Sequence, residues 1–226
     1  MPSKIRTVLF DLDGTLADTA PDLAAALNQL LEEEGRAPLP FEAIRPEVSH
    51  GSPGLLKVGF GMDSEHPDYA RLRARLLELY GANLCRETRL FPGMVELLAA
   101  LARAGRNWGI VTNKPKHLTE PLVRELKLAH PPACVVSGDS TANRKPHPEP
   151  MQLACTQAGS RPEQCLYVGD AQRDIEAGRR AGMKTLVALF GYISEHDTPE
   201  RWGADALIRH PRDILDWLNA EERTHA

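Results

Sequence analysis

Short, unbroken apolar runs recur along the chain, and each ends at polar residues. The first is Val8 to Phe10, preceded by Lys4 and Arg6. An apolar run without polar alternation is typical of a strand buried on both faces of a parallel sheet. Similar runs predict further strands at 108–111, 134–136, 165–168, 185–190 and 206–208.

Between these runs, from residue 94 onward, apolar residues recur at helical spacing. The pattern predicts helices at 94–104, 118–128, 149–158, 174–181 and 211–219. Strands that alternate with helices of this length indicate βαβ units and a parallel sheet. The fold class expected for this part of the chain is therefore α/β.

The stretch between the first strand and about residue 89 follows a different pattern, because it contains helical periodicity and no strand. We expect helices at 21–31, 41–49, 54–60 and 69–80. The segment 49–57 inside this block is rich in turn residues and holds His50 and Lys57. It is equally well interpreted as a plain interhelical loop or as a loop that reads a substrate.

Length and charge narrow the classes of function. A chain of 226 residues suits one large domain, or one domain that carries an insertion. The net charge of -4 gives no basic surface for nucleic acid or for an anionic membrane, so small soluble partners are expected. The four cysteines form no C-x-x-C pair and have no histidines nearby at zinc spacing, so a metal cage or redox motif is not predicted. We expect them to be reduced thiols in a cytoplasmic protein. No apolar stretch is long enough to predict export or a membrane span.

Two aspartates follow the first strand directly. If the chain stays extended for one more step, the side chains of Asp11 and Asp13 point to the same side. Gly14 permits a tight turn after them, and main-chain amides in such a turn can cradle an anion. Asp-Gly is also a common turn signal, so a plain strand-to-turn junction is the alternative.

Polar residues stand at the ends of other predicted strands as well. They are Thr112 and Asn113, then Lys145 in the next loop, and finally Asp170 with Asp174. Each alone has an ordinary structural explanation, such as a helix cap, a solvated lysine or a turn. Because ligands of α/β proteins bind beyond the carboxyl ends of the strands, their shared position predicts a phosphate and magnesium site.

Cleavage of a phosphomonoester needs an in-line nucleophile and a proton for the leaving alkoxide. In this interpretation Asp11 attacks phosphorus and forms an aspartyl-phosphate, which divides one difficult hydrolysis into two steps. Asp13 protonates the leaving oxygen and then acts as the base that activates water.

A dianionic ester approaching a carboxylate needs a compensating cation, and oxygen-rich sites suit Mg²⁺. Asp11, Asp170 and the main-chain carbonyl of Asp13 are the expected ligands. Asp174, one helical turn after Asp170, is expected to reach the metal through water or to hold the other ligands in place.

Donors for the phosphoryl oxygens are expected from the other strand ends. Lys145 would neutralise Asp11 and the phosphoryl group together. Thr112 and the amide of Asn113 would donate hydrogen bonds to the phosphoryl oxygens.

The four-part set D-L-D-G-T, I-V-T-N, K-P and G-D-x-x-x-D, in this order, resembles the haloacid-dehalogenase superfamily of phosphatases over essentially the whole chain. The resemblance implies a Rossmann-like parallel sheet core, formed by residues 1–16 and 90–226, with an all-helical cap inserted at 17–89. It also implies that the cap closes over the site and excludes water.

Two branches of the superfamily share these core motifs. The segments T-N-K-P and K-P-H-P-E-P resemble phosphoglycolate phosphatases, whereas the tail G-Y-I followed by W-G-A-D resembles N-acetylmuramic acid 6-phosphate phosphatases. The cap is expected to decide between them. The hypothesis for cap recognition is that His50 or Lys57 meets the carboxylate present in both substrates.

Other functions fit these residues less well. A dehalogenase or a phosphonatase of this superfamily has no need of a second acid such as Asp13. A β-phosphoglucomutase-like enzyme keeps both aspartates and remains an alternative. A response-regulator receiver shares an acidic pocket but is about half this length and has no cap insertion.

Overall fold

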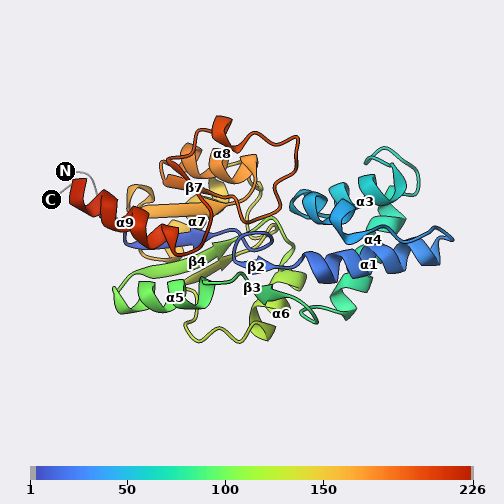
Figure 1. Cartoon of the computed structure of the whole chain (residues 1–226), viewed down its shortest axis with the longest axis horizontal. Coiled ribbons are helices and arrows are strands. Elements are labelled where there is room, and N and C mark those ends of the chain that lie inside the picture. The colour runs from blue at the N-terminus through green and yellow to red at the C-terminus, as the bar shows by residue number, and fades with distance from the viewer. Residues whose placement is uncertain (1–3, 225–226) are drawn as a thin grey trace.

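The computed structural model describes residues 4–224, in which six parallel strands form one central sheet (Figure 1). The strand order is β5-β4-β1-β6-β7-β8, with every neighbouring pair parallel. The α/β prediction is thus confirmed. The strands are β1 Thr7–Phe10, β4 Asn107–Val111, β5 Cys134–Val136, β6 Cys165–Gly169, β7 Lys184–Ala188 and β8 Ala206–Ile208.

Helices cover both faces of this sheet, and β1 shows why its apolar run has no polar alternation. Val8 and Phe10 pack into one apolar cluster with α5 and α9, whereas Leu9 packs into another with α7 and α8. Successive strand residues point to opposite faces, so both faces of β1 need apolar side chains. The helices are α5 Met94–Arg103, α6 Lys116–Glu125, α7 Glu149–Gln157, α8 Gln172–Ala181 and α9 Asp213–Thr224.

The segment between β1 and α5 forms a group of helices beside the sheet, at the right of Figure 1. These helices are α1 Ala20–Glu33, α2 Phe41–Ile44, α3 Gly51–Phe60 and α4 Tyr69–Ala82. They share an apolar cluster that includes Leu27, Leu30, Leu55 and Leu76, all fully buried. This group therefore has a core of its own.

Two short strands connect the helical group to the sheet. β2 Ala17–Asp18 and β3 Arg89–Leu90 pair antiparallel, with Ala17 opposite Leu90. Asp22 ties α1 to this connection, because its carboxylate accepts hydrogen bonds from the main-chain N–H groups of Glu87 and Thr88 at 2.9 and 3.0 Å. Strands of two residues have no periodicity, so the pattern did not predict them.

The prediction of an irregular loop at 49–57 is wrong. A 3₁₀ turn at Arg45–His50 leads directly into α3, which begins at Gly51. Pro53 lies in the first turn of α3, where the missing N–H of proline costs no helical hydrogen bond. The strand expected at 185–190 also ends earlier, at Ala188. In residues 4–224, no helix is both long and apolar enough to cross a membrane.

Candidate active site

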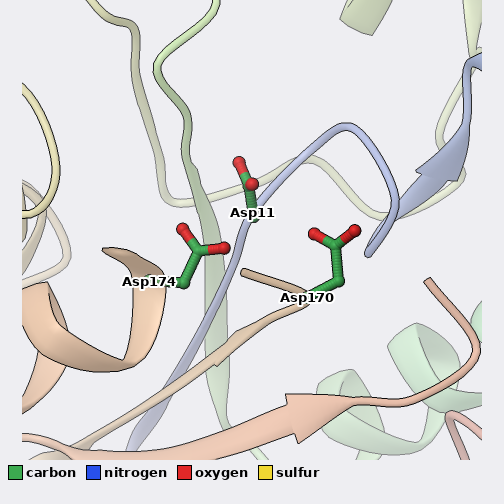
Figure 2. Close-up of side chains that lie close together, drawn as sticks. All are labelled: Asp11, Asp170 and Asp174. Atoms are coloured by element: carbon green, nitrogen blue, oxygen red, sulfur yellow. The ribbon is translucent and has the colours of Figure 1, made fainter. Parts of the chain in front are cut away.

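Three aspartates converge at the carboxyl edge of the sheet (Figure 2). Asp11 follows β1, Asp170 follows β6, and Asp174 lies in the first turn of α8. One carboxylate oxygen from each lies within 4.8 Å of the others, and all three side chains are buried. Since β1 and β6 are adjacent parallel strands, their ends necessarily bring Asp11 and Asp170 together.

Lys145 neutralises part of this cluster. Its Nζ lies 2.9 Å from Oδ1 of Asp11 and 2.8 Å from Oδ1 of Asp174. The same ammonium group donates to the carbonyl of Val111 and to the hydroxyl of Tyr167, each at 2.9 Å. A buried ammonium with four oxygen partners is held in one place, so Lys145 acts as a fixed positive charge beneath Asp11.

The cluster still contains more negative than positive charge. Burial raises the pKa of Asp170 to about 7, and the neighbouring carboxylates of Asp11 and Asp174 push it in the same direction. Burial also raises the pKa of Asp11 to about 6, against the attraction of Lys145. A divalent cation would relieve both effects, and three carboxylates are the hard oxygen ligands that Mg²⁺ prefers. The residues present therefore fit a metal centre.

Gly14 permits the close approach of its loop to this cluster. Its φ is +82°, and a Cβ at this position would lie 2.1 Å from Oδ2 of Asp170. Any side chain here would displace the Asp170 carboxylate. The glycine of the D-x-D-G-T motif is thus required by space as well as by backbone conformation.

Asp13 lies apart from the three clustered carboxylates. Its Oδ1 accepts a hydrogen bond from Thr19 Oγ1 at 2.6 Å and from Lys114 Nζ at 2.8 Å. Lys114 is itself buried and lies over the ring of Tyr80, with Nζ 4.4 Å from the centroid. Lys114 is not among the site residues predicted from the sequence, although its position directly after the T-N pair could have indicated it.

Asn113 braces the lysine loop. Its side chain donates to the carbonyl of Lys145 and accepts from the N–H of Lys145, both at 3.0 Å. The hydroxyl of Thr112 accepts a hydrogen bond from the N–H of Lys114 at 3.1 Å. The two residues predicted from the I-V-T-N motif thus position the two buried lysines.

A cavity of about 360 Å³ opens between the sheet edge and the helical group. Its sheet side includes Asp11, Asp13 and Thr112. His50 borders the cavity and is exposed, whereas Lys57 lies farther along α3, is exposed, and does not line it. Of the two cap residues predicted to bind the substrate, only His50 therefore lines the cavity. The full lining is Asp11, Asp13, Leu23, Val48, Ser49, His50, Gly51, Ser52, Pro53, Arg73, Leu77, Tyr80, Thr112, Asn113, Lys114, Pro115, Leu118, Arg144 and Arg173.

Ser49 extends from the helical group onto the acidic cluster. Its hydroxyl donates a 2.5 Å hydrogen bond to Oδ2 of Asp170. Arg173 of α8 donates to the main-chain carbonyl of Ser49. These contacts join the helical group to the sheet edge at Asp170 and to the first turn of α8.

Tyr192 makes a second connection from the other side. Its main-chain N–H donates to Oδ2 of Asp170 at 2.9 Å. Its hydroxyl donates to Asp18 at 2.8 Å and accepts from the N–H groups of Thr19 and Ala20 at 2.7 and 2.9 Å. One residue therefore links the acidic cluster to the start of α1. The G-Y-I segment contains Tyr192 but did not indicate this role, because the partners of Tyr192 lie more than 20 residues away.

Known proteins resemble this chain over nearly its full length. The N-acetylmuramic acid 6-phosphate phosphatase of Pseudomonas aeruginosa is 40% identical over 216 residues, which cover 96% of each chain. The phosphoglycolate phosphatase of Xanthomonas campestris is 43% identical over 214 residues, covering 93% of this chain and 95% of the relative.

A solved structure agrees with these relatives. That of a predicted phosphoglycolate phosphatase from Haemophilus somnus has a TM-score of 0.82 at 28% identity and covers 94% of this chain and 97% of that one. The family model described as haloacid dehalogenase-like hydrolase matches residues 8–188, which include all the aspartates described above. The chain belongs to the haloacid dehalogenase-like hydrolase family.

Proposed function

We propose that this protein is a Mg²⁺-dependent phosphatase that hydrolyses a small phosphorylated metabolite. The observation that carries the proposal is the placement of Asp11 and Asp13. Asp11 lies in the acidic cluster with Lys145, whereas Asp13 lies outside it with Lys114, and both border one cavity. Two carboxylates in different environments at one site can take different roles in one reaction.

Asp11 is the proposed nucleophile. Lys145 keeps its carboxylate in one orientation, and the N–H of Leu12 donates to Oδ1 of Asp11 at 2.8 Å. Attack on phosphorus would form an aspartyl-phosphate and release the alcohol. Asp13, held by Thr19 and Lys114, would give a proton to the leaving oxygen and then take one from the attacking water.

The metal would be held by Asp11, Asp170 and the main-chain carbonyl of Asp13. Asp174 would support these ligands indirectly, because it pairs with Lys145, which in turn contacts Asp11. When bound, Mg²⁺ would supply positive charge that offsets the repulsion between the phosphoryl oxygens and the nucleophile. Ser49 and Tyr192 orient the Asp170 carboxylate by hydrogen bonds to its Oδ2.

Residues 17–89 are proposed to act as a cap. They supply one wall of the cavity, while the sheet edge supplies the other. A closed cap excludes water during the attack and must open for product release. The β2–β3 pair, which joins the two parts, is the proposed hinge.

The substrate we favour is 2-phosphoglycolate, with N-acetylmuramic acid 6-phosphate as the second candidate. Relatives with both names match at 40–43% identity. A cavity of about 360 Å³ lies at the small end of the usual range for ligand pockets.

The four cysteines are free thiols, which supports a cytoplasmic site of action.

Steady-state phosphate release from both esters, with Mg²⁺ or with a chelator, tests the proposal. We expect Mg²⁺-dependent turnover of at least one ester and its loss in Asp11→Asn. Asp216→Asn, an exposed aspartate on α9, is the control and should retain full activity. Turnover that survives in Asp11→Asn would refute the mechanism. Transfer of phosphate between positions of a sugar, without release, would indicate the mutase alternative.

A further inference from the structure

Three arginines at alternate positions of α4 have different surroundings. Arg71 forms an ion pair with Glu34 at 2.6 Å, and Arg75 forms one with Glu33 at 2.8 Å. Arg73 lines the cavity. Residues two positions apart lie on nearly opposite sides of a helix, whereas residues four apart share a side. The helix therefore turns Arg73 towards the cavity, whereas Arg71 and Arg75 lie on its outer side.

Arg73 has no protein carboxylate as partner. Within residues 4–224 it forms no ion pair, and its one hydrogen bond runs from Nε to the hydroxyl of Ser52, at 3.1 Å. That contact orients the guanidinium and leaves its two terminal nitrogens available to a ligand. Ser52 also lines the cavity, so both side chains belong to the same wall.

The other cations around the cavity are already engaged at the sheet edge. Lys114 pairs with Asp13, and Arg173 donates to the main-chain carbonyl of Ser49 while the charges of the three aspartates raise its pKa. Arg144, which directly precedes Lys145 in the chain, donates to the carbonyl of Gly138. Among the described residues of the helical group, Arg73 is the one lysine or arginine that reaches the cavity.

We propose that Arg73 binds a carboxylate of the substrate, at the end of the molecule remote from the phosphoryl group. The proposal rests on the phosphatase function and assigns the substrate to the phosphorylated carboxylic acids. A guanidinium matches a carboxylate with two parallel hydrogen bonds, and it does so best where water is partly excluded. Arg73 thus replaces Lys57 in the role first expected for the cap, with His50 beside it on the same wall.

The test compares each acid with an analogue that lacks the carboxylate. The pairs are 2-phosphoglycolate with ethyl phosphate, and N-acetylmuramic acid 6-phosphate with N-acetylglucosamine 6-phosphate. In Arg73→Gln, kcat/KM for the acid should fall by about ten- to a hundredfold, mainly through KM, because one charge-assisted contact is lost. The value for the analogue should change by less than about twofold.

Two further variants make the result specific. Arg73→Lys keeps the charge without the paired geometry and should recover part of the preference for the acid. Arg71→Gln, on the outer side of the same helix, should leave both substrates unaffected. An equal loss for acid and analogue in Arg73→Gln, or no loss for either, would overturn the role of Arg73.

Turnover of the carboxylate-free analogues reports the phosphatase function separately. If the unsubstituted protein hydrolyses the analogues in an Asp11-dependent manner but shows no preference for the acids, only the role of Arg73 fails. If it hydrolyses neither acids nor analogues, the proposed function fails and the assignment of Arg73 fails with it.

Discussion

The ammonium group of Lys114 lies 2.8 Å from Oδ1 of Asp13, and both side chains are largely buried in the lining of the cavity. Thr19 donates to the same oxygen, at 2.6 Å. The carboxylate proposed to move protons is therefore held by one residue from the sheet edge and one from the start of the helical group. Its orientation depends on how these two parts of the chain are placed relative to each other.

Lys114→Met should lower kcat/KM for the favoured ester by more than about tenfold, because Asp13 loses its charged donor. It should also reduce the free energy of unfolding by about 1–3 kcal/mol, since a partly buried carboxylate is left without its cation. Urea unfolding and phosphate release measure the two effects. Lys116→Met, an exposed lysine two residues later, is the control and should change neither. Full activity in Lys114→Met would show that Thr19 alone positions Asp13.

Tyr192→Phe should destabilise the protein by about 1–3 kcal/mol. The change removes the one acceptor shared by the N–H groups of Thr19 and Ala20, and it also removes the hydrogen bond to Asp18. Denaturant unfolding measures the loss. Tyr69→Phe on α4, whose hydroxyl makes no hydrogen bond within residues 4–224, is the matched control. Equal stability of the two variants would mean that water replaces the Tyr192 hydroxyl at no cost.

Asp170→Asn should abolish metal-dependent activity and yet stabilise the metal-free protein near pH 8. Burial and two neighbouring carboxylates oppose the charge on Asp170, so a neutral amide removes an unfavourable electrostatic contribution of up to about 4 kcal/mol. Thermal unfolding in the presence of a chelator measures the gain. Asp216→Asn, at an exposed position, should leave the melting temperature unchanged. A destabilised Asp170→Asn protein would show that the contacts with Ser49 and Tyr192 outweigh the repulsion.

Metal and protons should compete for the acidic cluster. The pKa values of about 6 for Asp11 and about 7 for Asp170 lie above the ordinary value of 3.8. Between about pH 4 and pH 7 the metal-free folded protein thus binds more protons than the unfolded chain, so these groups lower its stability as pH rises. Mg²⁺ prefers the ionised carboxylates and should remove this loss.

Thermal unfolding with Mg²⁺ and with chelator checks this competition. The increase in Tm on adding Mg²⁺ should exceed about 3 °C near pH 8 and be smaller near pH 5.5. Asp170→Asn should show little increase at either pH. A larger effect of Mg²⁺ at the lower pH would contradict the assigned direction of the two pKa shifts.

The local sequence pattern was sufficient to predict the strands that position the proposed catalytic residues. The apolar run before Asp11 predicted a buried strand, and the alternation after residue 94 predicted the parallel sheet. The carboxyl ends of parallel strands meet at one edge of the sheet, so the sequence predicts that Asp11 and Asp170 lie close together, as they do. The fold class and the main acidic cluster could therefore be predicted from local sequence patterns.

Other side chains at the site are placed by tertiary packing. Ser49 and Arg73 reach the site through the packing of the helical group on the sheet edge, whereas Tyr192 reaches Asp170 from the segment that follows β7. Helical periodicity separates buried from exposed positions, but it does not show which inward position faces a cavity and which faces an apolar neighbour. Arg73 differs from Arg71 and Arg75 only in the direction that α4 gives it, and that direction is a property of the packed molecule.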